Sequence, residues 1–114
     1  MCVAIVVPEG KKAPSAEILR DCAAANQDGG GVAWVDDGQV HWNKGYQDKE
    51  DIDKLIKFIH TLPTPMVIHF RIATVGGKGQ GLTHPFPLTQ DNTLKLQGKT
   101  KAGVMIHNGH WGGW

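Results

Sequence analysis

Val32-Ala-Trp-Val-Asp-Asp-Gly-Gln-Val-His-Trp42 is the part of this 114-residue chain from which the architecture can be worked out. Two short runs rich in Val and Trp flank the sequence Asp36-Asp37-Gly38. An Asp-Gly pair tolerates the positive φ angles of a tight turn, and β-prone residues on both sides make the pair a hairpin signal. The residues therefore predict two antiparallel strands and place a sheet in the core.

Further strands are predicted on both sides of this hairpin. Residues 2–7, Cys-Val-Ala-Ile-Val-Val, form an unbroken apolar run, which is typical of a fully buried strand. Residues 66–70 show the same pattern, and residues 103–107 are the last strand candidate. The glycine-rich residues 75–81 and the polar residues 89–101 have no usable period, so we expect loops or edge segments there.

Two helices alternate with these strands. Pro14 stands near a helix start, and the apolar residues that follow it share one helical face, which predicts a helix over residues 14–25. The spacing of Ile52, Leu55, Ile56 and Ile59 predicts a second helix over about residues 49–61, ending before Pro63. Together with the strands, the two helices predict an α+β fold.

Composition and charge narrow the class of protein. The length suits one domain over residues 1–114, and 40% hydrophobic with 20% charged residues is ordinary for a globular chain. The formal net charge of +1 offers no field that would attract nucleic acid or an anionic membrane. No apolar run approaches the roughly 18 residues of a membrane span. We therefore expect a small neutral substrate or a protein partner, with neither nucleic acid nor membrane bound.

Cysteine usage and the N-terminus point to a reducing compartment. Cys2 and Cys22 are too few for a disulfide framework, and the opening strand lacks the pattern of a cleaved signal peptide. We expect a cytoplasmic protein. His107 and His110 have a metal-like spacing without further ligands, so neither a metal nor a cofactor is expected.

Several short motifs follow one another in a particular order: Met1-Cys2 before a strand, Asn26-Gln-Asp28-Gly-Gly-Gly31, His69-x-Arg71-x-Ala73-Thr74-x-Gly76, His84-Pro85 and His107-Asn108-Gly109. In this order the chain resembles the class II glutamine amidotransferases, whose glutaminase domain belongs to the N-terminal-nucleophile hydrolase superfamily. The resemblance implies an αββα sandwich. The family domain continues well beyond the His-Asn-Gly motif, so we expect this sandwich to be incomplete and to lack the acidic residue that holds the substrate amino group.

The resemblance implies that Cys2 is the nucleophile. Removal of Met1 would leave a thiol and a free α-amine on one residue, and an α-amine has a pKa of roughly 7.7–8.0, close to working pH. Cys2 would attack the side-chain amide of glutamine and form a thioester. The alternative is that Cys2 is a small apolar residue at the start of a buried strand.

Asn108 and Gly109 resemble the oxyanion hole of this family, in which an amide group and a backbone N–H stabilise the tetrahedral intermediate. The same two residues also suit a tight turn at the end of a strand. Arg71 would bind the substrate α-carboxylate through its guanidinium fork, or it would form an internal salt bridge with Asp28 or another acid. Thr74 would add a hydroxyl group to the substrate pocket, before a glycine-rich segment that resembles the family's closing loop.

The remaining implied site residues have supporting roles. Asn26 and Asp28 would form the floor of the site near the nucleophile, although both also suit a helix cap and a turn. His84 would form part of the pocket wall. A partner chain or self-association would cover the open sheet of a half sandwich. Two interpretations from different classes thus remain: a glutaminase, and a catalytically silent scaffold that binds a protein partner. A third, narrower one is an N-terminal-nucleophile amidase that acts on another substrate with a carboxylate.

Overall fold

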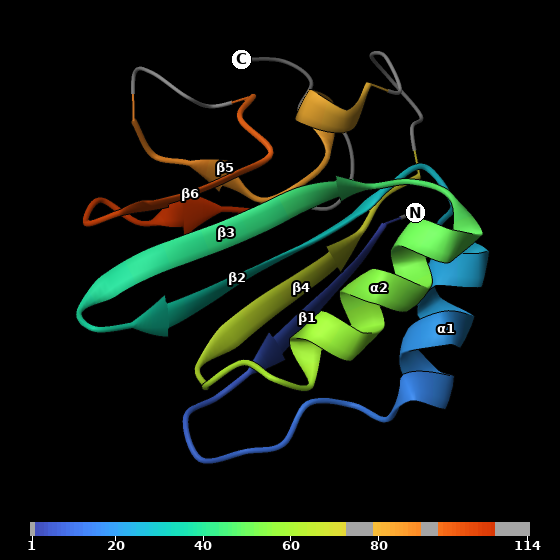
Figure 1. Cartoon of the computed structure of the whole chain (residues 1–114), viewed down its shortest axis with the longest axis horizontal. Coiled ribbons are helices and arrows are strands. Elements are labelled where there is room, and N and C mark those ends of the chain that lie inside the picture. Colours follow the sequence, from blue (N-terminus) through green and yellow to red (C-terminus); the bar gives the residue numbers. More distant parts are fainter. Residues whose placement is uncertain (1, 73–78, 90–93, 107–114) are drawn as a thin grey trace, which may run out of the picture.

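The computed structural model describes residues 2–72, 79–89 and 94–106. Two helices cover one face of a five-stranded antiparallel sheet, and a two-stranded sheet lies toward the opposite face (Figure 1). The elements are β1 (Val3–Val7), α1 (Ala16–Ala25), β2 (Gly30–Asp36), β3 (Gln39–Tyr46), α2 (Lys49–Ile59), β4 (Met66–Phe70), a 3-10 helix (Gln80–Leu82), β5 (Phe86–Pro87), β6 (Gln97–Thr100) and β7 (Val104–Met105). The predicted α+β class is confirmed.

The predicted hairpin is present as β2 and β3. Their register pairs Trp34 with His41 and Asp36 with Gln39. The two turn residues have the positive φ angles that a two-residue hairpin requires, 52° at Asp37 and 70° at Gly38. Trp34 and His41 also stack at 5.5 Å between ring centroids, so this cross-strand pair supports the same register.

The order of strands in the large sheet is β1-β4-β2-β3-β6, and every neighbouring pair is antiparallel. The strand that comes fourth in the chain, β4, therefore lies between the first two. Phe70 pairs with Val3 on one side and with Gly30 on the other. This arrangement brings the start of β1, the end of β4 and the start of β2 to one end of the sheet.

Both helices begin at side-chain caps. Ser15 accepts a hydrogen bond from the backbone N–H of Ile18, and Asp48 accepts one from the N–H of Asp51. Both helices occupy the predicted places, α1 beginning two residues later than predicted and α2 ending two residues earlier. The core lies between the helices and the sheet, where Leu19, Leu55, Ile56, Ile59, Val32, Ile68 and Phe70 are almost fully buried.

Strand β1 differs from its prediction. A fully buried strand was expected, but the side chain of Val6 is 67% exposed. The sheet order makes β1 an edge strand, paired with β4, and only one of its two faces lies against the helices. The prediction was wrong because an unbroken apolar run does not show whether both faces of a strand are covered.

The polar and glycine-rich segments contain short elements. Residues 97–100 form β6, which pairs with β3 at the far edge of the sheet, in keeping with the edge segment predicted there. Strand β7 pairs with β5, so the last predicted strand is present in a shorter form. Within the described ranges, no helix combines the length and the apolar character needed to cross a bilayer.

Candidate functional site

The structure brings Cys2 close to Arg71 at one end of the sheet. Val3 pairs with Phe70 at the last position of the β1–β4 ladder, which puts Cys2 and Arg71 opposite each other one step further along. The Sγ of Cys2 lies 3.4 Å from the backbone N of Ile72 and 3.5 Å from its carbonyl oxygen. The thiol is half-buried, so it is packed against the end of β4 and remains partly accessible.

Asp28 lies on the other side of Arg71. Its backbone N–H donates to the carbonyl of Arg71 at 2.7 Å, and the N–H of Arg71 donates to the carbonyl of Gly29 at the same distance. These bonds continue the β2–β4 ladder beyond its last strand residues. Cys2, Arg71 and Asp28 therefore come from three neighbouring chain segments, although they are far apart in the sequence.

Arg71 is the most informative of these residues. Its side chain is 8% exposed, and its Nη1 is buried without a hydrogen-bond partner among the described residues. Burying a guanidinium group is unfavourable unless its N–H groups find acceptors. A carboxylate is the acceptor whose two oxygens match the guanidinium fork. Arg71 thus has the chemistry of a binding residue for an anionic group.

Asn26 is the C-cap of helix α1. Its side-chain amide donates to the carbonyl of Cys22 at 3.0 Å, and its backbone N–H donates to Ala23. Its Oδ1 is buried and has no hydrogen-bond partner in the described part of the chain. Asn26 therefore ends the helix and leads the chain toward Asp28, two residues further on.

His84 lies on the sheet face opposite the helices. Its ring stacks on the ring of His69 at 4.0 Å between centroids and 14° between planes, and it meets Phe86 edge-on at 4.9 Å. His84 is 6% exposed and His69 is fully buried. Because His69 precedes Arg71 by two residues in an extended segment, both side chains point to the same face. His84 thus lies over the strand that leads to Arg71.

Three of the expected site residues, Thr74, Asn108 and Gly109, lie outside the described residues. The same is true of Met1 and of residues 75–78 in the segment expected to close over the substrate, whereas the end of that segment, residues 79–81, leads into the 3-10 helix Gln80–Leu82. The oxyanion hole and the state of the α-amine therefore stay predictions.

Lys44 is a site neighbour that the sequence reasoning missed. It belongs to β3, is 3% exposed, and its Nζ lies 4.2 Å from the centroid of the Phe86 ring. Burial lowers the pKa of Lys44 to about 8. The signal was present in the sequence, since Lys44 follows the buried Trp42 by two residues and an extended strand would place both on one face.

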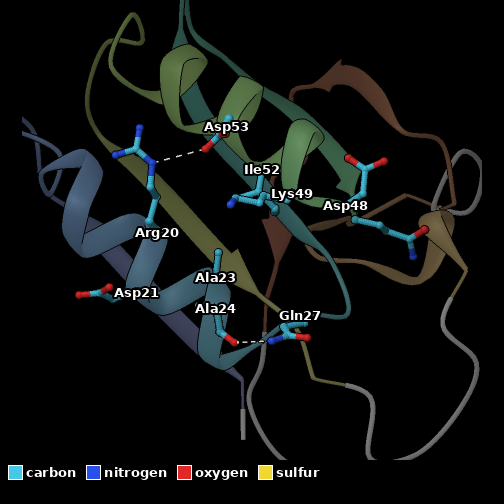
Figure 2. A pocket seen from close by; sticks show the side chains of 10 residues that line it. Arg20, Asp21, Ala23, Ala24, Gln27, Asp48, Lys49, Ile52 and Asp53 are labelled. Atoms are coloured by element: carbon cyan, nitrogen blue, oxygen red, sulfur yellow. Dashed lines mark hydrogen bonds and ion pairs between the residues drawn. The ribbon is translucent and has the colours of Figure 1, made fainter.

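A pocket of about 640 Å³ lies elsewhere, between the two helices (Figure 2). Its lining comes from the second half of α1, the first turns of α2 and the adjoining loops, and it includes none of the expected site residues. Arg20 and Asp53 form an ion pair at 3.4 Å in this lining, and both are well exposed. Exposed pairs of this kind contribute little to stability.

At this end of the sheet, the thiol of Cys2, which has the chemistry of a nucleophile, lies near Arg71, whose guanidinium group has the chemistry to bind an anion. Cys2 and Cys22 are both free, so the thiol of Cys2 is not consumed in a disulfide.

Comparisons of the chain with protein-family models, with curated proteins and with solved structures gave no match.

Proposed function

We propose that this chain hydrolyses the side-chain amide of glutamine, which is the glutaminase half-reaction of a class II amidotransferase, on an incomplete N-terminal-nucleophile sandwich. The observation that carries the proposal is the position of Cys2 opposite Arg71. A thiol beside a buried guanidinium suits a substrate that has a reactive carbonyl at one end and a carboxylate at the other. The order of the sequence motifs adds the support of the family resemblance.

The proposed reaction has two steps. After removal of Met1, the α-amine of Cys2 takes the thiol proton while Sγ attacks the amide carbon of glutamine. The tetrahedral intermediate then collapses, the C–N bond breaks, and the proton passes to the leaving nitrogen, which departs as ammonia. Water attacks the remaining thioester, the C–S bond breaks, and glutamate is released with the thiol restored.

The supporting residues have roles that follow the resemblance. Asn108 and the N–H of Gly109 stabilise the oxyanion, Arg71 binds the α-carboxylate, and Thr74 contacts the substrate. Asp28 and Asn26 support the floor of the site, and His84 forms part of its wall. The protein acts without metal or cofactor, in the cytoplasm.

The test is the intact mass of the purified protein before and after exposure to the glutamine analogue diazo-oxo-norleucine. We expect a mass that lacks Met1 and the addition of one analogue per chain. The adduct should disappear in Cys2→Ala and persist in Cys22→Ala, which removes the other free, half-buried thiol. In Arg71→Met the half-saturating concentration of the analogue should rise about ten- to hundredfold, as expected for lost hydrogen bonds to a charged group.

Retention of Met1 together with the absence of an adduct would refute the hydrolase, because the acylated Cys2 would have no amine base. An adduct that persists in Cys2→Ala would equally rule out Cys2 as the nucleophile.

The exposed side of the sheet favours a second function, a scaffold that associates with a second copy of this chain. Val6 and Val35 are 67% and 39% exposed on the face opposite the helices. The register places Val67 beside Val6 and Val40 beside Val35 on the same face. These four valines, named here the valine patch, carry no charge, so two copies can meet face to face without like-charge repulsion.

A further inference from the structure

Lys44 is a buried charged residue that the proposed reaction does not use. The register pairs Lys44 with Gly31 and Gly31 with His69, so the three residues form one row across β3, β2 and β4. Residues paired in this way point to the same face. Lys44 and His69 therefore flank a glycine on the sheet face that also carries Arg71.

The space above Gly31 is filled by the segment that contains His84. A Cβ atom added at Gly31 would overlap the carbonyl oxygen of His84. The Phe86 ring lies over the ammonium group of Lys44, and the same ring meets the edge of His84. His84 in turn stacks on His69. A continuous series of contacts thus runs from Lys44 through Phe86 and His84 to His69.

Besides these ring contacts of His84 and Phe86, hydrogen bonds attach the preceding residues of the segment, Gln80 and Thr83, to β3. The N–H of Gly45 donates to the hydroxyl of Thr83 at 2.8 Å, and Thr83 donates to the carbonyl of Gln80 at 2.7 Å. The side-chain amide of Gln80 returns to the carbonyl of Gly45 at 2.9 Å. This second attachment uses neutral groups, whereas Lys44 contributes a charged contact to the segment through the face of Phe86.

We propose that Lys44 is a positioning residue, whose ammonium group holds Phe86 and thereby keeps the His84 ring on His69 next to Arg71. The inference rests on the proposed function in so far as the wall formed by His84 shapes the substrate site. The role requires the charged form, since a neutral amine has no electrostatic attraction to the face of a ring. The titratable groups in this series of contacts are His69 from β4 and His84 from the segment over the sheet, and Arg71 is the fixed charge on the same face.

The test uses two pairs of variants and two measurements. Lys44→Met removes the charge at similar length, and Lys44→Arg keeps a cation that can stack on the ring. Phe86→Leu removes the ring, and Phe86→Tyr keeps it. The first measurement follows the ring-proton NMR signals of His69 and His84 from pH 6.5 to 9.5. The second is the rate of Cys2 labelling by diazo-oxo-norleucine as a function of its concentration.

We expect Lys44→Met and Phe86→Leu to lose the ring-current shifts that the stacked histidines cause in each other. Both variants should raise the half-saturating concentration of the analogue about tenfold, with the rate at saturation unchanged, whereas Lys44→Arg and Phe86→Tyr should stay close to the wild type. In the wild type, the His84 signals should show an additional transition with a midpoint near pH 8, where Lys44 loses its proton.

Unchanged histidine signals in folded Lys44→Met would overturn the proposal. If that variant does not fold, the Phe86→Leu and Phe86→Tyr pair decides by the same NMR criterion. Absence of labelling in the wild type would overturn the glutaminase and not the positioning role, because the histidine signals report the position of His84 without any reaction.

Discussion

Gly31 lies between two parts of the candidate site, and its missing side chain is what allows them to approach. The carbonyl of His84 occupies the position that a Cβ would take, and the Cβ of Lys44 lies 2.9 Å from that position. One of the obstructing atoms belongs to the backbone, so it cannot move away by a simple rotamer change. A glycine at this position is needed for close packing and not for an unusual φ angle.

Replacement of Gly31 by Ala should lower the free energy of unfolding by about 1–3 kcal/mol, the usual cost of forcing an extra carbon into a packed position. Gly79→Ala is the matched control, because a Cβ there would meet no atom of the described residues within 4 Å. Chemical denaturation of both variants measures the difference. Equal stability of Gly31→Ala and wild type would show that the segment around His84 does not lie on this strand as described.

At the level of elements, the helices depend on their caps because each is short. Helix α2 has 11 residues, and its N-terminus is capped by the carboxylate of Asp48, which accepts the N–H of Asp51 at 2.7 Å. Isolated helices of this length are marginal in water, so capping and packing against the sheet must stabilise them. The buried side chains of Leu55, Ile56 and Ile59 supply the packing.

Asp48→Ala should therefore destabilise the protein by about 0.5–2 kcal/mol, the usual effect of losing an N-cap acceptor. Asp48→Asn retains an acceptor of similar shape and should remain within a few tenths of the wild type. The midpoints of urea denaturation distinguish the two variants. A loss of equal size in both would point to the negative charge near the helix N-terminus, and not to the cap, as the stabilising feature.

Strand placement explains which local expectations failed. The hairpin and both helices were correctly predicted from residues 32–42, 14–25 and 49–61, because turn chemistry and helical periodicity act within a few residues. The exposure of one face of β1 and the burial of Lys44 were not predicted. Only one face of the edge strand β1 lies against the helices, so its other face stays exposed in spite of the apolar run. On the inner strand β3, the segment around Phe86 covers the charged residue Lys44.

For the whole molecule, the decisive feature is that the two faces of the large sheet are covered differently. The helices cover one face, and the other carries the segment around His84 and leaves Val6 and Val35 of the valine patch exposed. Figure 1 shows the helices on one side of the large sheet and β5 on the other. An exposed apolar sheet face is a common association surface.

If a second copy covers the valine patch, the protein should dimerise as its concentration rises. Val6→Lys should raise the dissociation constant at least tenfold, since a buried methyl cluster would then face an unpaired charge. Ile18→Lys is the control, because Ile18 is 53% exposed on α1, on the opposite side of the sheet. Analytical ultracentrifugation over a concentration series gives both constants. A monomer at all concentrations, or an equal effect of the two variants, would exclude this dimer.

The residues of the candidate site illustrate how far local reasoning extends. Cys2, Asp28, Arg71 and His84 were selected from short motifs, whose chemistry is visible in the sequence. The closeness of Cys2, Asp28 and Arg71 was not visible, because it depends on the insertion of β4 between β1 and β2. That pairing joins segments about 40 and 70 residues apart, and no local propensity specifies it.

The chain's own periodicity and turn residues are thus sufficient for the hairpin, both helices and the strand Met66–Phe70, because these elements are stabilised by contacts within a few residues. The strand order, the exposure of Val6 and the burial of Lys44 are properties of the folded molecule. They depend on which distant segments lie against each face of the sheet. A face without such a cover leaves Val6 exposed, whereas a covered face buries Lys44, and the loss of solvent lowers the pKa of that lysine.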